Sequence, residues 1–385
     1  MTGTHPLSPT VVVAPNCFRG YATAAEVATA LADGVRDTLP EAQVALMPLA
    51  DGGDGTLDAL AAARGGERRF LDAPDAQGQL RRTPWLALDA RSAVIETAQV
   101  CGLGALRPHE VNPLEASSAG VGRAVGAAVA AGATTVLLGL GGTAVVDGGV
   151  GALAALGARF LGADGRAVPP RPGNLQSVVR VDLEPARRLL VGVSLRLLSD
   201  VRTPLAGNLQ TFGAQKGVTD QNRPAAVRAL EHLVRLLEAA GDRTARARFE
   251  EPWFGAGGGT GFGLSAVATS SAENGAEGLL GIVDPDDAIG SAALAITAEG
   301  AVDESTWQGK LPGAVAQRRQ RRGLPTAMVA VRFAPAVPRQ LVSTHRVVGA
   351  ALSTAPTGPD LWDGLARAAA DACRTWPLVE FVEQI

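Results

Sequence analysis

The sequence predicts an α/β protein built around a parallel sheet. Several short, continuous apolar runs alternate with stretches that have helical character, and the runs gather near the two ends of the chain. Continuous apolar runs of this length are typical of strands that are covered on both faces, as in a parallel sheet. At 385 residues the chain is long enough for two domains with substantial cores.

The apolar runs that we predict as strands are Val11–Ala14, Gln43–Met47, Ala293–Thr297, Ala327–Val331 and His345–Gly349. The stretches that we predict as helices are Ala24–Leu39, Thr56–Arg64, Pro312–Arg322 and Asp360–Arg374. This order predicts a discontinuous flavodoxin/Rossmann-like domain over 1–72 and 291–385, interrupted by a second α/β domain over 73–290. We expect the substrate cleft between these two domains.

The inserted segment has its own alternation of elements. Strands are predicted at Ala93–Glu96 and Thr134–Leu138, and helices at Gly120–Ala131 and Arg223–Ala240. A glycine-rich stretch, Gly255–Gly263, is predicted as a flexible loop that leads back to the first domain.

Composition excludes several classes of protein. The net charge is −3 with 19% charged residues, and no basic stripe suits a nucleic-acid backbone. The longest apolar stretch, Val125 to Leu140, is too short to span a bilayer, and no signal peptide is evident. Three scattered cysteines indicate free thiols. We therefore expect a cytoplasmic protein, monomeric or homodimeric, that does not bind nucleic acid or membranes.

Lysine is rare in this chain. Of the 35 basic residues only Lys216 and Lys310 are lysine, and both lie among loop-forming residues. A lysine ammonium meets a phosphate as a compact point charge, which suits a phosphate-binding loop. The alternative is that two lysines were retained by chance under a coding bias toward arginine.

Two loops repeat one pattern. Asp51-Gly-Gly-Asp-Gly55 and Asp147-Gly-Gly-Val-Gly151 each follow an apolar strand and precede an Ala-Leu-rich helix. The glycines would let backbone N–H groups approach an anion at the helix N-terminus, with the aspartate available to Mg²⁺. The alternative is that each aspartate caps its helix and the glycines make a tight turn.

Polar residues collect where predicted strands end. In chain order they are Asn16, Arg19, Asp51, Asp54, Asp147, Asp200, Glu299 and Asp303. In open α/β sheets ligands bind beyond the carboxyl ends of the strands. Carboxylates that hold Mg²⁺, cations that neutralise phosphate and an aspartate that accepts a hydroxyl proton are the requirements of phosphoryl transfer.

The chain resembles the bacterial glycerate kinase family, the two-domain type without a Walker A motif. Pro48-Leu-Ala-Asp-Gly-Gly-Asp-Gly-Thr56 is similar to the family's Ala-Asp-Gly-Gly-Glu-Gly-Thr, and Phe212-Gly-Ala-Gln-Lys-Gly217 to its Phe-Gly-Pro-Gln-Lys-Gly. The other similar segments, in the family's order, are Val13–Gly20, Gly139–Gly149, Ser199–Leu205 and Thr297–Asp303 followed by Lys310. Both lysines thus fall in family motifs.

The resemblance, together with the strand-end residues, implies an ATP- and Mg²⁺-dependent phosphotransferase acting on the hydroxyl of a small hydroxy acid, with glycerate as the default acceptor and 2-phosphoglycerate as the product. We expect Asp200, Asp147, Lys310 and Lys216 to be catalytic, with Asp200 and Asp147 near the metal. The residues expected to bind substrate or phosphate are Asn16, Arg19, Asp51, Gly52, Gly53, Thr56, Gly141, Gly142, Thr143, Glu299 and Asp303.

Some motif positions depart from the family. Asn16 and Arg19 stand where the family has aspartate and lysine, and Val145 and Val146 stand where it has threonine and asparagine. We expect the two valines to make the acceptor pocket less polar and to shift specificity away from glycerate. The alternatives are an enzyme of a biosynthetic pathway with a non-glycerate substrate, or a catalytically impaired, kinase-like protein that binds or regulates.

Overall fold

The structure, a computed structural model, describes residues 8–105, 111–199, 201–333, 347–351 and 359–375. It divides into two compact units: unit 1 comprises Met1–Ala50 with Leu279–Ile385, and unit 2 comprises Asp51–Gly278. Unit 1 is therefore discontinuous in sequence, and unit 2 is inserted into it. Both units are α/β, so the predicted fold class is confirmed.

Unit 1 contains a five-stranded sheet in the order β13-β12-β11-β1-β2. The strands are β1 (Thr10–Val13), β2 (Gln43–Leu46), β11 (Leu294–Val302), β12 (Thr326–Phe333) and β13 (Val347–Ala351). All neighbouring pairs are parallel. Numbered within the unit, the order is 2-1-3-4-5, which is the flavodoxin-like order with its switch point between β1 and β11.

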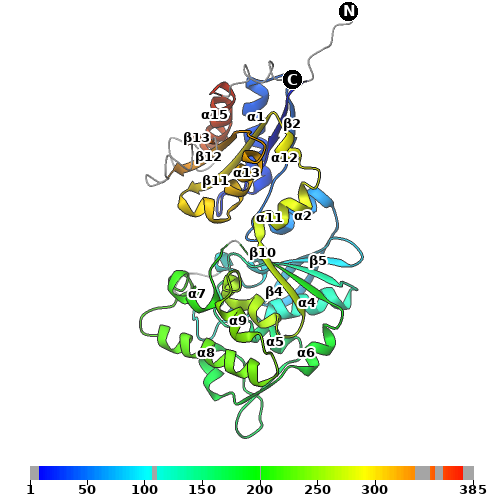
Figure 1. Cartoon of the computed structure of the whole chain (residues 1–385), viewed down its shortest axis with the longest axis vertical. Coiled ribbons are helices and arrows are strands. Elements are labelled where there is room, and N and C mark those ends of the chain that lie inside the picture. Colours follow the sequence, from blue (N-terminus) through cyan, green and yellow to red (C-terminus); the bar gives the residue numbers. More distant parts are fainter. Residues whose placement is uncertain (1–7, 106–110, 200, 334–346, 352–358, 376–385) are drawn as a thin grey trace, which may run out of the picture. The chain divides into compact units, whose positions relative to one another are not determined.

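Helices cover both faces of this sheet. On one face α1 (Ala24–Thr38) lies beside α15 (Pro359–Thr375), and their apolar residues pack on β1, β11 and β12 (Figure 1). On the other face α13 (Leu311–Gln320) packs on Met328 and Ala330. Helices α11 (Gly275–Val283) and α12 (Ala288–Ser291) lie where the chain returns to unit 1, whose second segment begins at Leu279.

A buried arginine joins three elements of unit 1. Arg319, near the end of α13, is fully buried. Its Nε donates to the Pro325 carbonyl at 2.7 Å, and its Nη1 donates to the carbonyls of Ile289 and Ala292 at 2.7 and 2.9 Å. Its Nη2 donates to the Ala293 carbonyl at 3.3 Å. Burial lowers the pKa of Arg319 to about 10, so the guanidinium remains charged at neutral pH.

Unit 2 contains a six-stranded sheet in the order β10-β9-β6-β5-β4-β3. The strands are β3 (Glu67–Pro74), β4 (Leu80–Ala87), β5 (Ser92–Glu96), β6 (Thr135–Gly139), β9 (Ser194–Ser199) and β10 (Thr269–Asn274). The four strands from β5 to β10 are parallel, whereas β3 and β4 form an antiparallel hairpin at one edge. A small antiparallel pair, β7 (Arg159–Leu161) and β8 (Arg180–Asp182), lies apart from this sheet.

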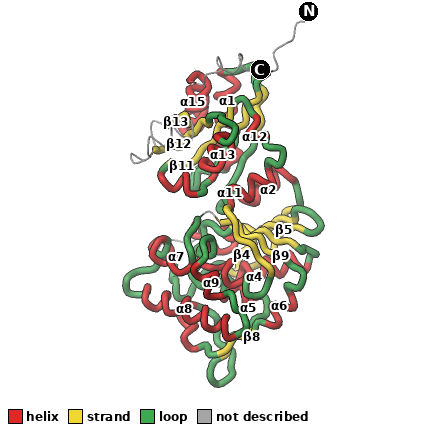
Figure 2. Tube along the Cα trace, in the orientation of Figure 1, coloured by secondary structure: helices red, strands yellow, loops and turns green. Residues whose placement is uncertain are grey.

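Figure 2 shows the strands of unit 2 as one layer, with α2 on one side and most of the other helices on the opposite side. The helices are α2 (Thr56–Arg64), α3 (Thr97–Cys101), α4 (Ala119–Ala130), α5 (Val150–Ala155), α6 (Glu184–Leu189), α7 (Leu205–Thr211), α8 (Arg223–Ala239), α9 (Ala245–Glu250) and α10 (Thr260–Leu264). Their apolar faces and the sheet form one large core of alanine, valine and leucine.

The expectation of a flexible loop at Gly255–Gly263 is wrong. This stretch forms a 3₁₀ turn (Ala256–Gly259) followed by α10, and its residues are buried. Gly258 has φ +63°, and a Cβ there would lie 1.9 Å from the Val145 carbonyl oxygen. The Asn208 side chain also donates to the Gly255 carbonyl at 2.6 Å. The glycines therefore permit close backbone packing rather than mobility.

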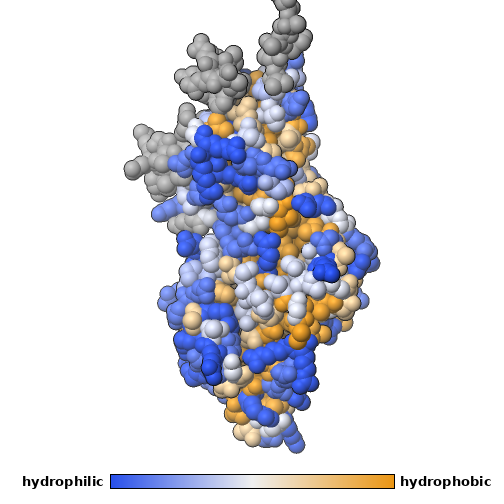
Figure 3. Space-filling view, turned by 45° about the vertical axis from the view of Figure 1, so that its right-hand side comes forward, coloured by the Kyte–Doolittle hydropathy of each residue, from blue (hydrophilic) through white to orange (hydrophobic). Residues whose placement is uncertain are grey.

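At the surface, apolar residues emerge in separate patches beside hydrophilic ones, as the face in Figure 3 shows. Among the helices of the described residues, none has the length and apolar character needed to cross a membrane. The three cysteines are free, and burial raises the pKa of Cys101 to about 12. That thiol therefore stays protonated and unreactive at neutral pH.

Candidate functional site

The first group of predicted residues lies at the switch point of unit 1. Asn16 follows β1, is 7% exposed, and its backbone N–H donates to the Ala298 carbonyl of β11 at 2.9 Å. Its side-chain oxygen accepts from the Cys17 N–H at 2.8 Å. Arg19, three residues later, is exposed. Ligands of doubly wound sheets bind at such a switch point, beyond the carboxyl ends of the strands.

Lys310 meets two carboxylates here. Its Nζ lies 3.3 Å from Glu299 Oε1 and 3.9 Å from Asp303 Oδ1. Its side chain is 29% exposed, so the ammonium reaches solvent. The backbone of Lys310 also forms the N-cap of α13. An accessible cation beside a helix N-terminus is an environment that attracts an anion.

Glu299 and Asp303 differ in how they are held. We expected Glu299 to follow its strand, but β11 continues to Val302, so Glu299 lies within it and Asp303 directly after it. Thr306 donates to Glu299 at 3.4 Å, and Asp303 caps the 3₁₀ turn Glu304–Gln308 by accepting from the Ser305 N–H at 2.9 Å. Burial alone would raise the pKa of Asp303, but the Ser305 hydrogen bonds and the Lys310 charge lower it. Asp303 is therefore ionised at neutral pH.

The second group lies in unit 2, where the loop Asp51–Gly55 crosses the carboxyl ends of the parallel strands. The Gly141 N–H donates to the Gly52 carbonyl at 3.0 Å, and a Cβ on Gly52 would lie 2.6 Å from the Leu198 carbonyl oxygen. Gly52 also has φ +91°. Asp54 comes so close to Gly142 that a Cβ there would lie 3.4 Å from Asp54 Oδ1. Glycines at these positions let the loop pack directly on the strand ends.

Glu96 holds this loop and was not predicted from the sequence. It is the last residue of β5 and is 1% exposed. Its carboxylate accepts from the Gly55 N–H at 3.2 Å and from the Leu57 N–H at 3.0 Å. These are donors at the N-terminus of α2 that we expected an anionic ligand to use. A carboxylate of the protein occupies them instead.

Burial raises the pKa of Glu96 to about 7 from its usual value of 4.5, in spite of these hydrogen bonds. The folded state then binds more protons than the unfolded state between these two values, so stability falls as pH rises through this window, by at most about 3 kcal/mol. We expect Glu96→Gln to remove that part of the pH dependence. Urea unfolding of the original protein and of Glu96→Gln at pH 5 and pH 7.5 measures how much the free energy of unfolding changes between the two pH values. An equal change in the two proteins would contradict the prediction.

Asp147 is the first residue of the corresponding loop, Asp147–Gly151, and is fully buried. Its Oδ2 accepts from the N–H and the hydroxyl of Ser118, both at 2.8 Å, and from the Gly151 N–H at 3.1 Å. Its Oδ1 accepts from the Gly149 N–H at 3.1 Å. Burial raises the pKa of Asp147 even though all these donors favour the ionised form. These contacts favour the alternative interpretation of the repeated loops, in which a buried carboxylate caps the following helix.

We therefore expect Asp147→Asn to lower stability by about 2–3 kcal/mol, because the introduced amide would point a donor at N–H groups that remain buried. The activity of the folded Asp147→Asn protein should depend on Mg²⁺ concentration as the activity of the original protein does. Denaturant unfolding and a Mg²⁺ titration of activity check both parts. A large shift of the Mg²⁺ requirement with unchanged stability would instead make Asp147 a metal ligand.

Lys216 contacts the segment Leu140–Val146, which follows β6, and is 4% exposed. Its Nζ donates to Thr143 Oγ1 at 3.2 Å and to the Val145 carbonyl at 3.1 Å. Val145 and Val146 are 0% and 1% exposed and belong to the core of unit 2. The expectation that these valines make the acceptor pocket less polar is not supported, because their side chains are enclosed among apolar neighbours. Lys216 therefore supports this segment by donating hydrogen bonds to the Val145 carbonyl and to the Thr143 hydroxyl.

The structure thus collects the predicted residues into one group in each unit. Unit 1 brings together Asn16, Glu299, Asp303 and Lys310, and unit 2 brings the loop Asp51–Thr56 onto the segment Gly139–Thr143. Asp200 lies outside the described residues. Within the part of the chain that is described, no group of three or more His, Cys, Asp or Glu residues could hold a metal ion by itself.

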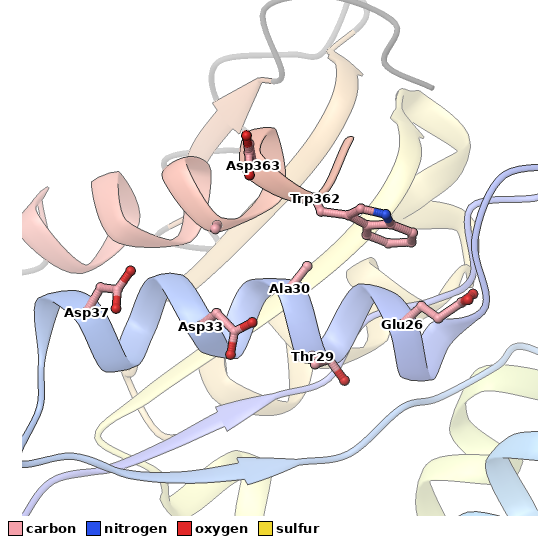
Figure 4. Close-up of a pocket in the computed structure, with 8 residues that line it drawn as sticks. Glu26, Thr29, Ala30, Asp33, Asp37, Trp362 and Asp363 are labelled. Atoms are coloured by element: carbon pink, nitrogen blue, oxygen red, sulfur yellow. The ribbon is translucent and has the colours of Figure 1, made fainter. Parts of the chain in front are cut away.

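A separate groove of about 590 Å³ lies between α1 and α15 (Figure 4). Trp362 forms part of its wall, and its other lining residues include Glu26, Asp33, Asp37 and Asp363. It contains none of the predicted site residues. Its carboxylates would repel a phosphate or a carboxylic acid, so we do not regard this groove as the site of phosphoryl transfer.

Comparison with known proteins finds relatives that share one family description. A sequence model described as the glycerate kinase family matches residues 11–376. A glycerate kinase from Halalkalibacterium halodurans is 32% identical over 325 residues, covering 83% of this chain and 85% of the relative. A glycerate 2-kinase from Escherichia coli is 31% identical over 324 residues, covering 83% and 84%. The crystal structure assigned as glycerate kinase 2 from Salmonella typhimurium LT2 superimposes with a TM-score of 0.79 at 28% identity, covering 98% of this chain and 100% of that one.

Proposed function

The chain belongs to the glycerate kinase family and is a kinase, and we propose that it transfers the γ-phosphoryl group of ATP to a hydroxyl of glycerate, giving 2-phosphoglycerate. The observation that supports this most directly is the arrangement at the switch point of unit 1. There an accessible ammonium, that of Lys310, lies between Glu299 and Asp303 at the N-terminus of a helix. It supplies the positive charge that a transferring phosphoryl group requires.

We assign Lys310 to the phosphate and Asp200 to the acceptor hydroxyl. Lys310 would neutralise the charge that spreads over the phosphoryl oxygens in the transition state. Glu299 and Asp303 orient its ammonium, since both carboxylates lie within 4 Å of Nζ. Asp200 directly follows β9 in the sequence, and it would accept the proton that the hydroxyl loses on attack. The exposed Arg19 would contribute a second cation for the carboxylate of the acceptor or for a phosphate.

Magnesium fits the chemistry of the donors in these groups. Mg²⁺ prefers oxygen ligands and is usually held by one or two carboxylates together with substrate phosphates and water. The partly buried carboxylates of Asp51 and Asp54, in the loop on the strand ends of unit 2, are of this type. The sequence offers a further carboxylate in Asp200, directly after β9. We propose that Asp200 holds the ion, with Asp51 and Asp54 as supporting acids. When bound, the ion would neutralise charge on the phosphates.

The test is an assay of ATP consumption with Mg²⁺ over a panel of hydroxy acids that includes glycerate and bulkier, less polar acceptors. Glycerate should be the preferred acceptor, because Val145 and Val146 lie in the core and do not line a pocket. Asp200→Asn removes the carboxylate that is proposed both to accept the hydroxyl proton and to help hold Mg²⁺, so it should lower turnover at least about 100-fold. Turnover of another acid in preference to glycerate would indicate a biosynthetic enzyme. ATP consumption with no acceptor of the panel would favour the binding or regulatory alternative.

A further inference from the structure

The hairpin of β3 and β4 leaves one long strand at the edge of the unit 2 sheet. Among the described residues β3 pairs only with β4, and its eight residues end the sheet. Phe70, in the middle of the strand, is 49% exposed. Arg68 and Asp72, two residues away on either side, are exposed too. Side chains alternate along a strand, so these three share one face.

The direction of the backbone groups of β3 follows from its register. Phe70 lies opposite Pro84 of β4. Proline has no N–H, so these two residues cannot exchange a pair of hydrogen bonds, and the hydrogen-bonded pairs must be their neighbours. The N–H and C=O groups of Phe70 therefore point away from β4, toward the free edge. The alternation of an antiparallel ladder gives Arg68 and Asp72 the same direction.

This edge is complementary to itself. If a second β3 paired with it antiparallel and Phe70 lay opposite Phe70, then Arg68 of each chain would lie opposite Asp72 of the other. All three residues present outward backbone groups, so this register would form about six backbone hydrogen bonds. Opposite charges facing each other across strands are stabilising, and the two exposed phenyl rings would cover one another. Arg82 already stacks on the Phe70 ring, 4.6 Å from its centroid.

We propose that the chain forms a homodimer in which two β3 strands pair antiparallel about a twofold axis at Phe70, which joins two unit 2 sheets into one. The charged residues of β3 have another interpretation, because charges on an edge strand commonly prevent pairing with other chains. They prevent pairing where like charges meet. In the register centred on Phe70 they meet with opposite sign, which favours pairing with a second copy of this chain.

Charge exchange tests this register. Sedimentation or light scattering should show a dimer of the 39.2 kDa chain, with a dissociation constant in the micromolar range. Arg68→Glu and Asp72→Arg, each alone, place like charges opposite one another twice per dimer, and each should weaken dimerisation at least tenfold. The double variant Arg68→Glu with Asp72→Arg should return to within about threefold of the original dissociation constant.

The double variant separates the interface from local effects. Within one chain Arg68 contacts Asp58, and Asp72 lies opposite Arg82. The double variant places like charges at both of these local contacts, as the single variants do at one each. Its dimerisation can therefore recover only through the restored charge pairs with the partner. Arg166→Glu, which changes a side chain that is 88% exposed and far from β3 in sequence, is the matched control and should leave the dimer unchanged. A monomer at all concentrations up to about 300 µM, or a double variant no better than the single ones, would overturn the proposal.

Cross-linking gives an independent measure of the register. Residues in a hydrogen-bonded antiparallel pair have Cα atoms about 5.5 Å apart, within the range that a disulfide spans. Phe70→Cys should therefore form a covalent dimer on mild oxidation. Asp72→Cys should not, because the two Cys side chains would be separated by about 13 Å along the strands. Equal cross-linking of both variants would show non-specific collision and would contradict the proposed axis.

Discussion

Lys310→Met is expected to lower kcat about 100-fold while it changes the KM for ATP and for the acceptor much less. The methionine fills a similar volume but removes the ammonium, which lies 3.3 Å from Glu299 and is partly open to solvent. Charge is redistributed between the transferring phosphoryl group and the leaving phosphate in the transition state, and a positioned cation stabilises that change. The loss should therefore appear in kcat rather than in ground-state binding. Steady-state kinetics of the purified variant measure it.

The control for this experiment is Lys310→Arg, which keeps the positive charge in a larger, forked group. We expect it to retain more activity than Lys310→Met, since the charge is kept and only its position changes. Thermal unfolding of both variants should stay close to that of the original protein, because partly exposed ion pairs contribute little to stability. A Lys310→Met protein with kcat within about threefold of the original would exclude Lys310 from phosphoryl transfer.

Arg319→Met is expected to lower the free energy of unfolding by about 3–5 kcal/mol. The guanidinium of Arg319 satisfies four carbonyl groups, those of Ile289, Ala292, Ala293 and Pro325. Methionine offers no donor, so these carbonyls would lose that partner inside the protein. The arginine is remote from the proposed chemistry, so the folded fraction of the variant should keep its kcat. Denaturant unfolding together with kinetics on the soluble fraction measures both.

Arg319→Lys is the matched variant. A lysine keeps the charge but has three donors on one atom, whereas the arginine distributes its donors over three nitrogens that face different carbonyls. We expect an intermediate loss of stability, smaller than that of Arg319→Met. If Arg319→Met proved as stable as the original protein, the cost of burying the charge would equal the value of its hydrogen bonds.

The sequence is sufficient to predict the five strands of the unit 1 sheet. Its strands are continuous apolar runs, and its long helices begin at clear signals such as the capping box of Thr23 and Glu26 at the start of α1. In unit 2 such signals are weaker. Strand β9 is interrupted by Arg196, which donates to Glu273 of β10 at 2.9 Å. Strand β10 has one apolar residue, Ala272, among its six, so neither strand shows the pattern of a buried strand and neither was predicted.

The candidate site is also only partly visible in the sequence. Family motifs single out Lys310, Asp51 and Asp147, but they do not reveal whether a side chain faces solvent. Asp51 and Asp147 belong to loops with the same glycine pattern, yet Asp51 is partly exposed and Asp147 is fully buried. Glu96 could not be identified as the cap of α2, because it acts on Gly55 from 41 positions away in the sequence. Only the packing of β5 against the loop brings them together.

The insertion of unit 2 has a consequence for the order of events during synthesis and folding. The pairing of β1 with β11 joins Val11 to Leu294, so unit 1 cannot complete its sheet until most of the chain has left the ribosome. Unit 2 is continuous and can fold earlier. Its two ends then meet, since Gly275 packs directly against the Asp51 carbonyl. A folded unit 2 thereby turns a very long loop closure into a short one, which lowers the entropy barrier to assembling unit 1.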